Sequence, residues 1–180
     1  MTAASRSFAA RVIGAARLDG ATYEEVARDP AATGQAVAVV LLTTAAAAVG
    51  SGSGVDPVGL AAVLLVGPTL WLVLALATGF AGTRLAPAPP ATGFLAFLRA
   101  LGFAETPGLL AVFGGVPAAG SAVAAVAAAW GFAAAVVAVR RTLGTSTGRA
   151  VAAVGLGLLL GIVAWVLLVA VIARAAEALF

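Results

Sequence analysis

The chain has 180 residues, of which 63% are hydrophobic and 9% are charged, and its mean hydropathy is +1.14. A soluble domain is about half apolar and about a quarter charged, so a single globule could not bury this much apolar surface, and lipid must cover the rest. The apolar runs are long and continuous, which excludes the alternating pattern of a membrane β-barrel. The composition therefore predicts an all-α integral membrane bundle.

The net charge is +3, and every basic residue is an arginine. The arginines are dispersed between apolar runs, which is typical of residues retained in the cytoplasm and disfavours nucleic-acid binding. The chain contains no cysteine and no histidine, which excludes disulfides, thiol chemistry and the usual ligands of zinc or haem. We therefore expect neither a metal nor a cofactor.

Residues 1–29 form a charged lead-in, which does not resemble a secretory signal peptide because no apolar core follows a short basic start. Periodicity predicts a first helix over about Ser5–Leu18, and Thr22 with Glu25 predicts a capping box at the start of a second. Two interpretations remain open. The first helix could lie on anionic lipid, or the lead-in could be a solvated leader that only fixes orientation.

The first two spans open with the same dipeptide, Asp-Pro, which suits a helix N-cap and first position. We expect spans over about 30–50 and 57–82, joined by a glycine–serine turn. Pro68 predicts a kink in the second span, where neighbouring groups can satisfy the freed carbonyl. Trp71 lies too deep for an interface belt and is expected to pack between helices.

The third span, over about 93–117, differs from the others because it contains ionisable residues. Thr92 can cap it, and the long side chain of Arg99 could extend back to the near interface. Glu105 follows, and Pro107 predicts that the helix breaks near its middle.

The last two predicted spans, over about 121–139 and 150–173, are rich in small residues. In the fourth span these recur in steps of four, at Ala127, Gly131 and Ala135. In the fifth span a Gly-xxx-Gly pair occupies 157–161. Such faces allow close helix approach either within the bundle or between chains of a homo- or hetero-oligomer. We favour packing within the bundle.

Arginine placement predicts the topology. With five spans and a cytoplasmic N-terminus, nine of the ten arginines face the cytoplasm and only Arg174 lies outside. If 92–117 instead entered and returned on the same side, three arginines would lie outside. The positive-inside rule favours the five-span arrangement, with the C-terminus outside a cell inner (plasma) membrane.

Three segments resemble bacterial members of the Yip family, the membrane proteins with a Ypt/Rab-interacting-protein domain. They are RVIGAARLDGATYEEVARDPAATGQAVAVV in and after the lead-in, LRALGFAETPGLL in the third span and WGFAAAVVAVRRTLGTSTGRAV near the fourth. The resemblance implies a five-span helical protein with a cytoplasmic N-terminus. Eukaryotic relatives act in vesicle trafficking and bind Rab GTPases and each other. The Rab partner is not carried over, because a shared fold need not keep the same partner.

Arg99, Glu105 and Pro107 form the candidate intramembrane polar site. An ionisable residue within a span costs about 2.5–3.5 kcal/mol on insertion scales and usually has a purpose. Glu105 could serve a proton- or cation-linked site at the broken helix, as in transporters. Alternatively, it could lie near the interface or pair with Arg99 or another arginine.

A second candidate site comprises Arg140, Arg141 and Arg149, which could contact anionic lipid head groups or a partner protein. They could equally be orientation signals flanking a span, which is the interpretation we favour.

We expect a non-enzymatic membrane protein of Yip type that organises or binds membrane components. The alternative is a small transporter or channel subunit that uses the broken third span. Enzymatic chemistry has little support, because there is no histidine or cysteine and Glu105 is the one plausible carboxylate within the bundle.

Overall fold

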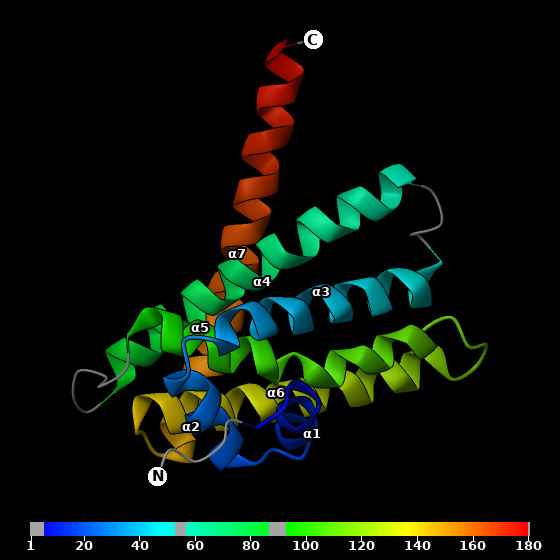
Figure 1. Cartoon of the computed structure of the whole chain (residues 1–180). Coiled ribbons are helices and arrows are strands. Elements are labelled where there is room, and N and C mark those ends of the chain that lie inside the picture. Colours follow the sequence, from blue (N-terminus) through cyan, green and yellow to red (C-terminus); the bar gives the residue numbers. More distant parts are fainter. Residues whose placement is uncertain (1–5, 53–56, 87–92, 180) are drawn as a thin grey trace.

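The computed structural model describes residues 6–52, 57–86 and 93–179, with side chains described as far as 175. Throughout this part of the chain the regular elements are helices (Figure 1). In order they are α1 (Phe8–Ala16), α2 (Gly20–Arg28), α3 (Ala32–Ser51), α4 (Pro57–Leu85), α5 (Phe94–Ala104), the 3-10 helix η1 (Thr106–Phe113), α6 (Gly120–Leu143) and α7 (Thr147–Leu179).

The predicted all-α class with five membrane-competent segments is confirmed. Four of the segments are single α-helices, namely α3, α4, α6 and α7, and the third consists of α5 followed by η1. All five are long and apolar enough to cross a bilayer. The chain is a multi-pass membrane protein in architecture.

Three helices extend beyond their predicted bounds, whereas the third span ends at Phe113, before the predicted residue 117. α4, α6 and α7 continue past the apolar runs, so that Arg84, Arg140, Arg141 and Arg149 lie inside helices. Arginine is a good helix former, and its long side chain lets the backbone stay helical while the charge leaves the apolar layer. Hydrophobicity alone therefore marks the membrane-competent length of these helices and underestimates their total length.

The lead-in folds as a helical hairpin, and its predicted capping box was wrong. Asp19 is the N-cap of α2, and its Oδ1 accepts from the Ala21 amide at 3.0 Å. The Thr22 hydroxyl instead donates to Asp19 Oδ2 at 2.7 Å. Glu25 turns toward Arg11, because a buried guanidinium is a stronger partner than a backbone amide.

The predicted start of the first span was wrong by two residues. Asp29 Oδ1 accepts from the Ala31 amide at 2.9 Å, and α3 begins at Ala32. The capping residues predicted for the next two spans, Asp56 and Thr92, lie outside the described residues. α4 continues as one helix through Pro68.

The helices form two groups. In the first, α3, η1, α5 and α6 lie together, with the hairpin of α1 and α2 docked on α5 and α6 (Figure 1). Here the backbones approach closely, since a Cβ at Gly50 would lie 1.8 Å from the Ala111 carbonyl oxygen of η1.

In the second group, α4 and α7 cross and then diverge, with the end of α7 projecting from the bundle (Figure 1). The crossing depends on glycine, because Gly157 lies against Thr78 and Gly161 against Leu74. The Gly-xxx-Gly face of α7 therefore packs within the chain, against α4.

Candidate intramembrane site and its arginines

The third span breaks because Pro107 has no amide hydrogen to donate to the Phe103 carbonyl. The Thr106 hydroxyl takes its place and donates to that oxygen at 2.7 Å. The Gly108 amide donates to the Glu105 carbonyl at 2.8 Å, and the chain continues as η1. Glu105 therefore lies at the junction of the two helices, as the sequence predicted from Pro107.

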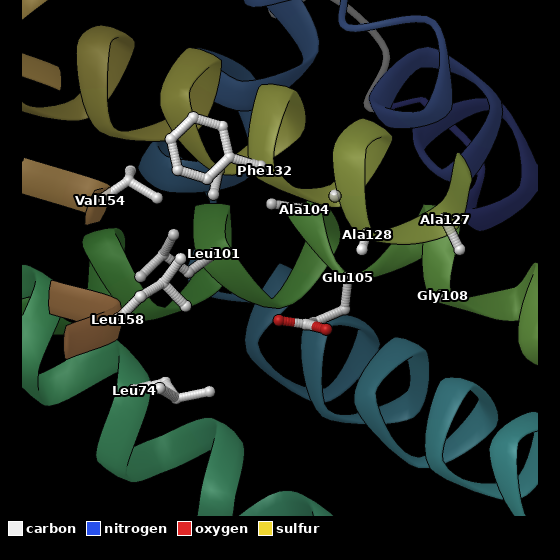
Figure 2. A pocket seen from close by; sticks show the side chains of 12 residues that line it. Leu74, Leu101, Ala104, Glu105, Gly108, Ala127, Ala128, Phe132, Val154 and Leu158 are labelled. Carbon is white, nitrogen blue, oxygen red and sulfur yellow. The ribbon is translucent and has the colours of Figure 1, made fainter. Parts of the chain in front are cut away.

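The Glu105 side chain lines a pocket with a volume of about 400 Å³. Figure 2 shows its carboxylate directed toward the side where Leu101 and Leu158 lie. The remaining walls are apolar and come from four spans. They are Leu74 of α4, Ala104 of α5, Gly108 of η1, Ala127, Ala128, Gly131, Phe132 and Ala135 of α6, and Val154 of α7.

The small residues of α6 create this space. Ala127, Gly131 and Ala135 all line the pocket, and a Cβ at Gly131 would find no atom within 4 Å. The four-residue spacing was predicted to allow close helix approach. Along this face the small side chains border a pocket, and the larger Phe132 forms part of its wall.

A second, smaller pocket adjoins the first and brings in a residue that the sequence interpretation had treated as packing alone. It has a volume of about 60 Å³, shares Glu105 and Leu158 with the larger pocket, and is also lined by Trp71 and Thr78. The Trp71 Nε1 atom is buried and has no hydrogen-bond partner in the described part of the chain. A tryptophan in an apolar span carries no sequence pattern that would have marked it as a site residue.

Arg99 does not pair with Glu105. It is buried, and its guanidinium donates to the backbone carbonyls of Val26, at 3.1 Å, and Ala27. It also donates to the Thr33 hydroxyl at 3.4 Å. Since the last carbonyls of a helix lack intrahelical partners, Arg99 caps the C-terminus of α2 and fixes the hairpin to α5.

Arg11 is a buried arginine that the sequence interpretation placed only among the orientation charges. Its side chain is 2% exposed and forms ion pairs with Glu25, at 3.0 Å, and Asp29. It also donates to the Gln35 amide oxygen of α3 at 2.9 Å. The guanidinium therefore joins α1, α2 and α3, and its hydrogen bond lowers the pKa of the Asp29 carboxyl.

The three arginines of the second candidate site are separated in role. Arg141 pairs with Glu24 of the hairpin at 3.0 Å, while Arg140 donates to the Thr147 hydroxyl at 3.2 Å. Arg149 is exposed, and its backbone amide lies 3.5 Å from the Ser146 hydroxyl at the start of α7. The structure thus places Arg141 in the docking of the hairpin and leaves Arg149 outward.

Among the described residues there is no group of three or more His, Cys, Asp or Glu side chains that could hold a metal ion. Comparisons with models of protein families, with curated proteins and with solved structures found no match.

Proposed function

We propose that this chain is a non-enzymatic membrane protein that binds or organises other membrane components, as its resemblance to the Yip family implies. The observation that supports this most is the exposure of α4 and α7. Only 6% of the most apolar stretch of α4 and 11% of that of α7 are buried, against 56% in the third span. Two long apolar helices with so little cover offer a surface for another membrane protein or for lipid.

The proposal includes an orientation. The hairpin lies in the cytoplasm of a bacterium, and α7 ends outside the plasma membrane. In support, the ends of α4 and α6 and the start of α7 lie toward the same end of the bundle as the hairpin (Figure 1). Arg84, Arg140, Arg141 and Arg149 occupy these helix ends, which agrees with the positive-inside rule. The outward Arg149 is the residue best placed to contact an anionic head group.

Photocrosslinking in cells tests the binding surface. A photoreactive amino acid replaces Leu65 of α4 or Leu167 of α7, which are 72% and 61% exposed. The control position is Val126 of α6, which is 55% exposed but lies outside the α4–α7 pair. We expect both test positions to give one reproducible protein adduct or a defined oligomer, and the control to give lipid adducts alone. Random neighbours at all three positions would count against the proposal.

A second candidate function, a small transporter or channel subunit, is favoured by one specific observation. Glu105 lies at the helix break and faces a pocket between spans, which is an arrangement that transporters use for coupling ions. Its test is cation flux through vesicles reconstituted with the protein or its Glu105→Gln variant. Flux that is equal in the two preparations would remove this candidate.

A further inference from the structure

The two adjoining pockets at Glu105 present one unpartnered acceptor and one unpartnered donor. Both belong to residues that line these pockets, whose shared walls from α4, α5, α6 and α7 include Leu101 and Leu158. The acceptor is the Glu105 carboxylate, which makes no ion pair with any described residue. The donor is the indole N–H of Trp71, which is buried without a partner in the same part of the chain.

Leaving these two groups unpaired is costly. A buried donor without an acceptor forfeits about 1–3 kcal/mol. The Glu105 side chain is exposed on a membrane-competent segment, where an isolated carboxylate beside lipid costs more. The nearest arginine in the sequence cannot relieve the carboxylate, because Arg99 is engaged with the carbonyls of α2. The protein itself therefore leaves both groups to be satisfied from outside the chain.

The space beside them is large enough for a molecule. The larger pocket holds about 400 Å³, which falls within the range of about 300–1,000 Å³ of small-molecule sites. The side chains of Leu101, Phe132 and Leu158 provide apolar contact. The open position beside Gly131 leaves further room.

We propose that this site binds a hydrophobic amine that also carries an oxygen acceptor. The ammonium group pairs with Glu105, the oxygen accepts from the Trp71 indole, and the hydrocarbon part contacts the apolar walls. The inference does not depend on the proposed scaffold role, since the crosslinking surface on α4 and α7 is defined by other residues.

Other ligand classes fit less well. A fatty acid would place its carboxylate beside that of Glu105 and would be repelled. A hydrated metal ion would lose water to apolar walls that offer one carboxylate in return. A pure hydrocarbon would leave both polar groups unsatisfied.

Equilibrium binding to the intact protein in neutral phosphatidylcholine nanodiscs tests the proposal. Labelled sphingosine, a long-chain amino alcohol, is the probe, and N-acetylsphingosine is its matched control without the positive charge. We expect saturable binding of one sphingosine per chain and binding of the acetylated form weaker by about tenfold or more, because the ion pair in an apolar site is lost. Displacement by propranolol, a compact amino alcohol, would indicate a free amine as ligand, and failure to displace would indicate a membrane amphiphile.

Five variants locate the site, three at its own residues and two as controls. Glu105→Gln should weaken sphingosine binding by about tenfold or more, and Trp71→Phe by about fivefold, the value of one hydrogen bond. Trp165→Phe is the matched control for the indole and should have no effect. Gly131→Leu should abolish binding by filling the pocket, whereas Gly155→Leu should not, since a Cβ at either glycine meets no atom within 4 Å but only Gly131 lines the pocket.

Helix content and the elution volume of each variant show whether it has folded. If Gly131→Leu fails to fold, Ala128→Val provides a smaller increase in side-chain volume in the same pocket. Non-saturable uptake of sphingosine by the wild-type protein would overturn the proposal. So would equal affinities of the wild-type and Glu105→Gln proteins, or equal binding of the acetylated probe.

Discussion

The hairpin side of the molecule and the α4–α7 pair are held together by different forces. On the hairpin side, Arg11, Arg99 and Arg141 connect α1 and α2 to the spans through ion pairs and hydrogen bonds. The α4–α7 crossing instead relies on small residues such as Gly157, and most of the two helices is exposed and apolar. The comparison shows a region that the chain completes by itself beside one that lipid or a partner must complete.

The hairpin also covers part of a span. The Trp130 indole donates to the Ala16 carbonyl of α1 at 2.8 Å. Trp130 precedes Arg140 by ten residues, which is about 15 Å along α6 at the helical rise of about 1.5 Å per residue. The hairpin therefore reaches α6 well away from its arginine end, and Trp130 reports on whether the hairpin is docked.

Among the variants considered, Arg11→Met is expected to change the stability of hairpin docking most. The variant removes the charge that holds Glu25 and Asp29 and should destabilise hairpin docking by about 3 kcal/mol, as breaking a buried ion pair does. Hydrogen exchange of α1 and α2 measures it. Arg17→Met is the control, because Arg17 is exposed. Equal protection in both variants would mean that the ion pairs do not hold the hairpin.

A smaller loss is expected from Arg99→Met, which removes the donors to Val26 and Ala27. Leaving two carbonyls without this donor should cost about 2 kcal/mol and expose the end of α2. Limited proteolysis between α2 and α3 is the readout. Arg99→Lys should restore only part of the protection, because an ammonium lacks the planar fork of a guanidinium. Full protection in Arg99→Met would contradict the capping role.

Gly157→Leu tests the other region. Its Cβ would lie 2.5 Å from the Thr78 Cα atom, so α4 and α7 must separate, at a cost of about 1–3 kcal/mol. The melting temperature in mild detergent should fall, while Trp130 fluorescence at low temperature stays unchanged. Gly155→Leu should leave the melting temperature as it is, since no atom lies within 4 Å of a Cβ there. A shift in Trp130 emission would show that the two regions are coupled.

The smallest expected effect is that of pH on the stability of hairpin docking. Hydrogen bonds from Thr22 and Arg6 lower the pKa of Asp19 to about 2, and a hydrogen bond from Arg11 lowers that of Asp29. A carboxylate with a depressed pKa contributes stability that is present above its unfolded pKa, here 3.8, and is lost as the pH falls through the folded value.

Docking should therefore weaken modestly between about pH 4 and pH 2. Trp130 emission, read in a protein that carries Trp71→Phe and Trp165→Phe, follows this loss. Loosening that begins well above pH 4 would point to other groups.

The sequence predicted the parts of the fold that depend on hydrophobic length. The five spans and the break at Pro107 follow from long apolar runs and from a missing amide hydrogen, which are local properties. Hairpin docking was not predictable, because Arg11 and Arg99 have the same local pattern as orientation arginines. Their burial depends on partners far away in the chain, such as Gln35 for Arg11.

The candidate site was only partly predictable, because some of its residues depend on distant partners. Glu105 stands out in any apolar run, whereas Trp71 acquires its role only because α4 crosses near α5 and α7. The small residues of α6 were recognisable by their spacing. Whether such a face closes on a neighbour or leaves a pocket is decided by the side chains opposite, which periodicity does not reveal.

The number and direction of the membrane crossings can be measured directly, because the chain has no native cysteine. Arg17→Cys places a thiol on the exposed part of the hairpin, and Ala175→Cys places one near the end of α7. With a membrane-impermeant maleimide, intact cells should label the α7 cysteine, and the hairpin cysteine should react only after permeabilisation. Labelling of the hairpin cysteine in intact cells, or protection of the α7 cysteine until the membrane is opened, would contradict five crossings with a cytoplasmic N-terminus.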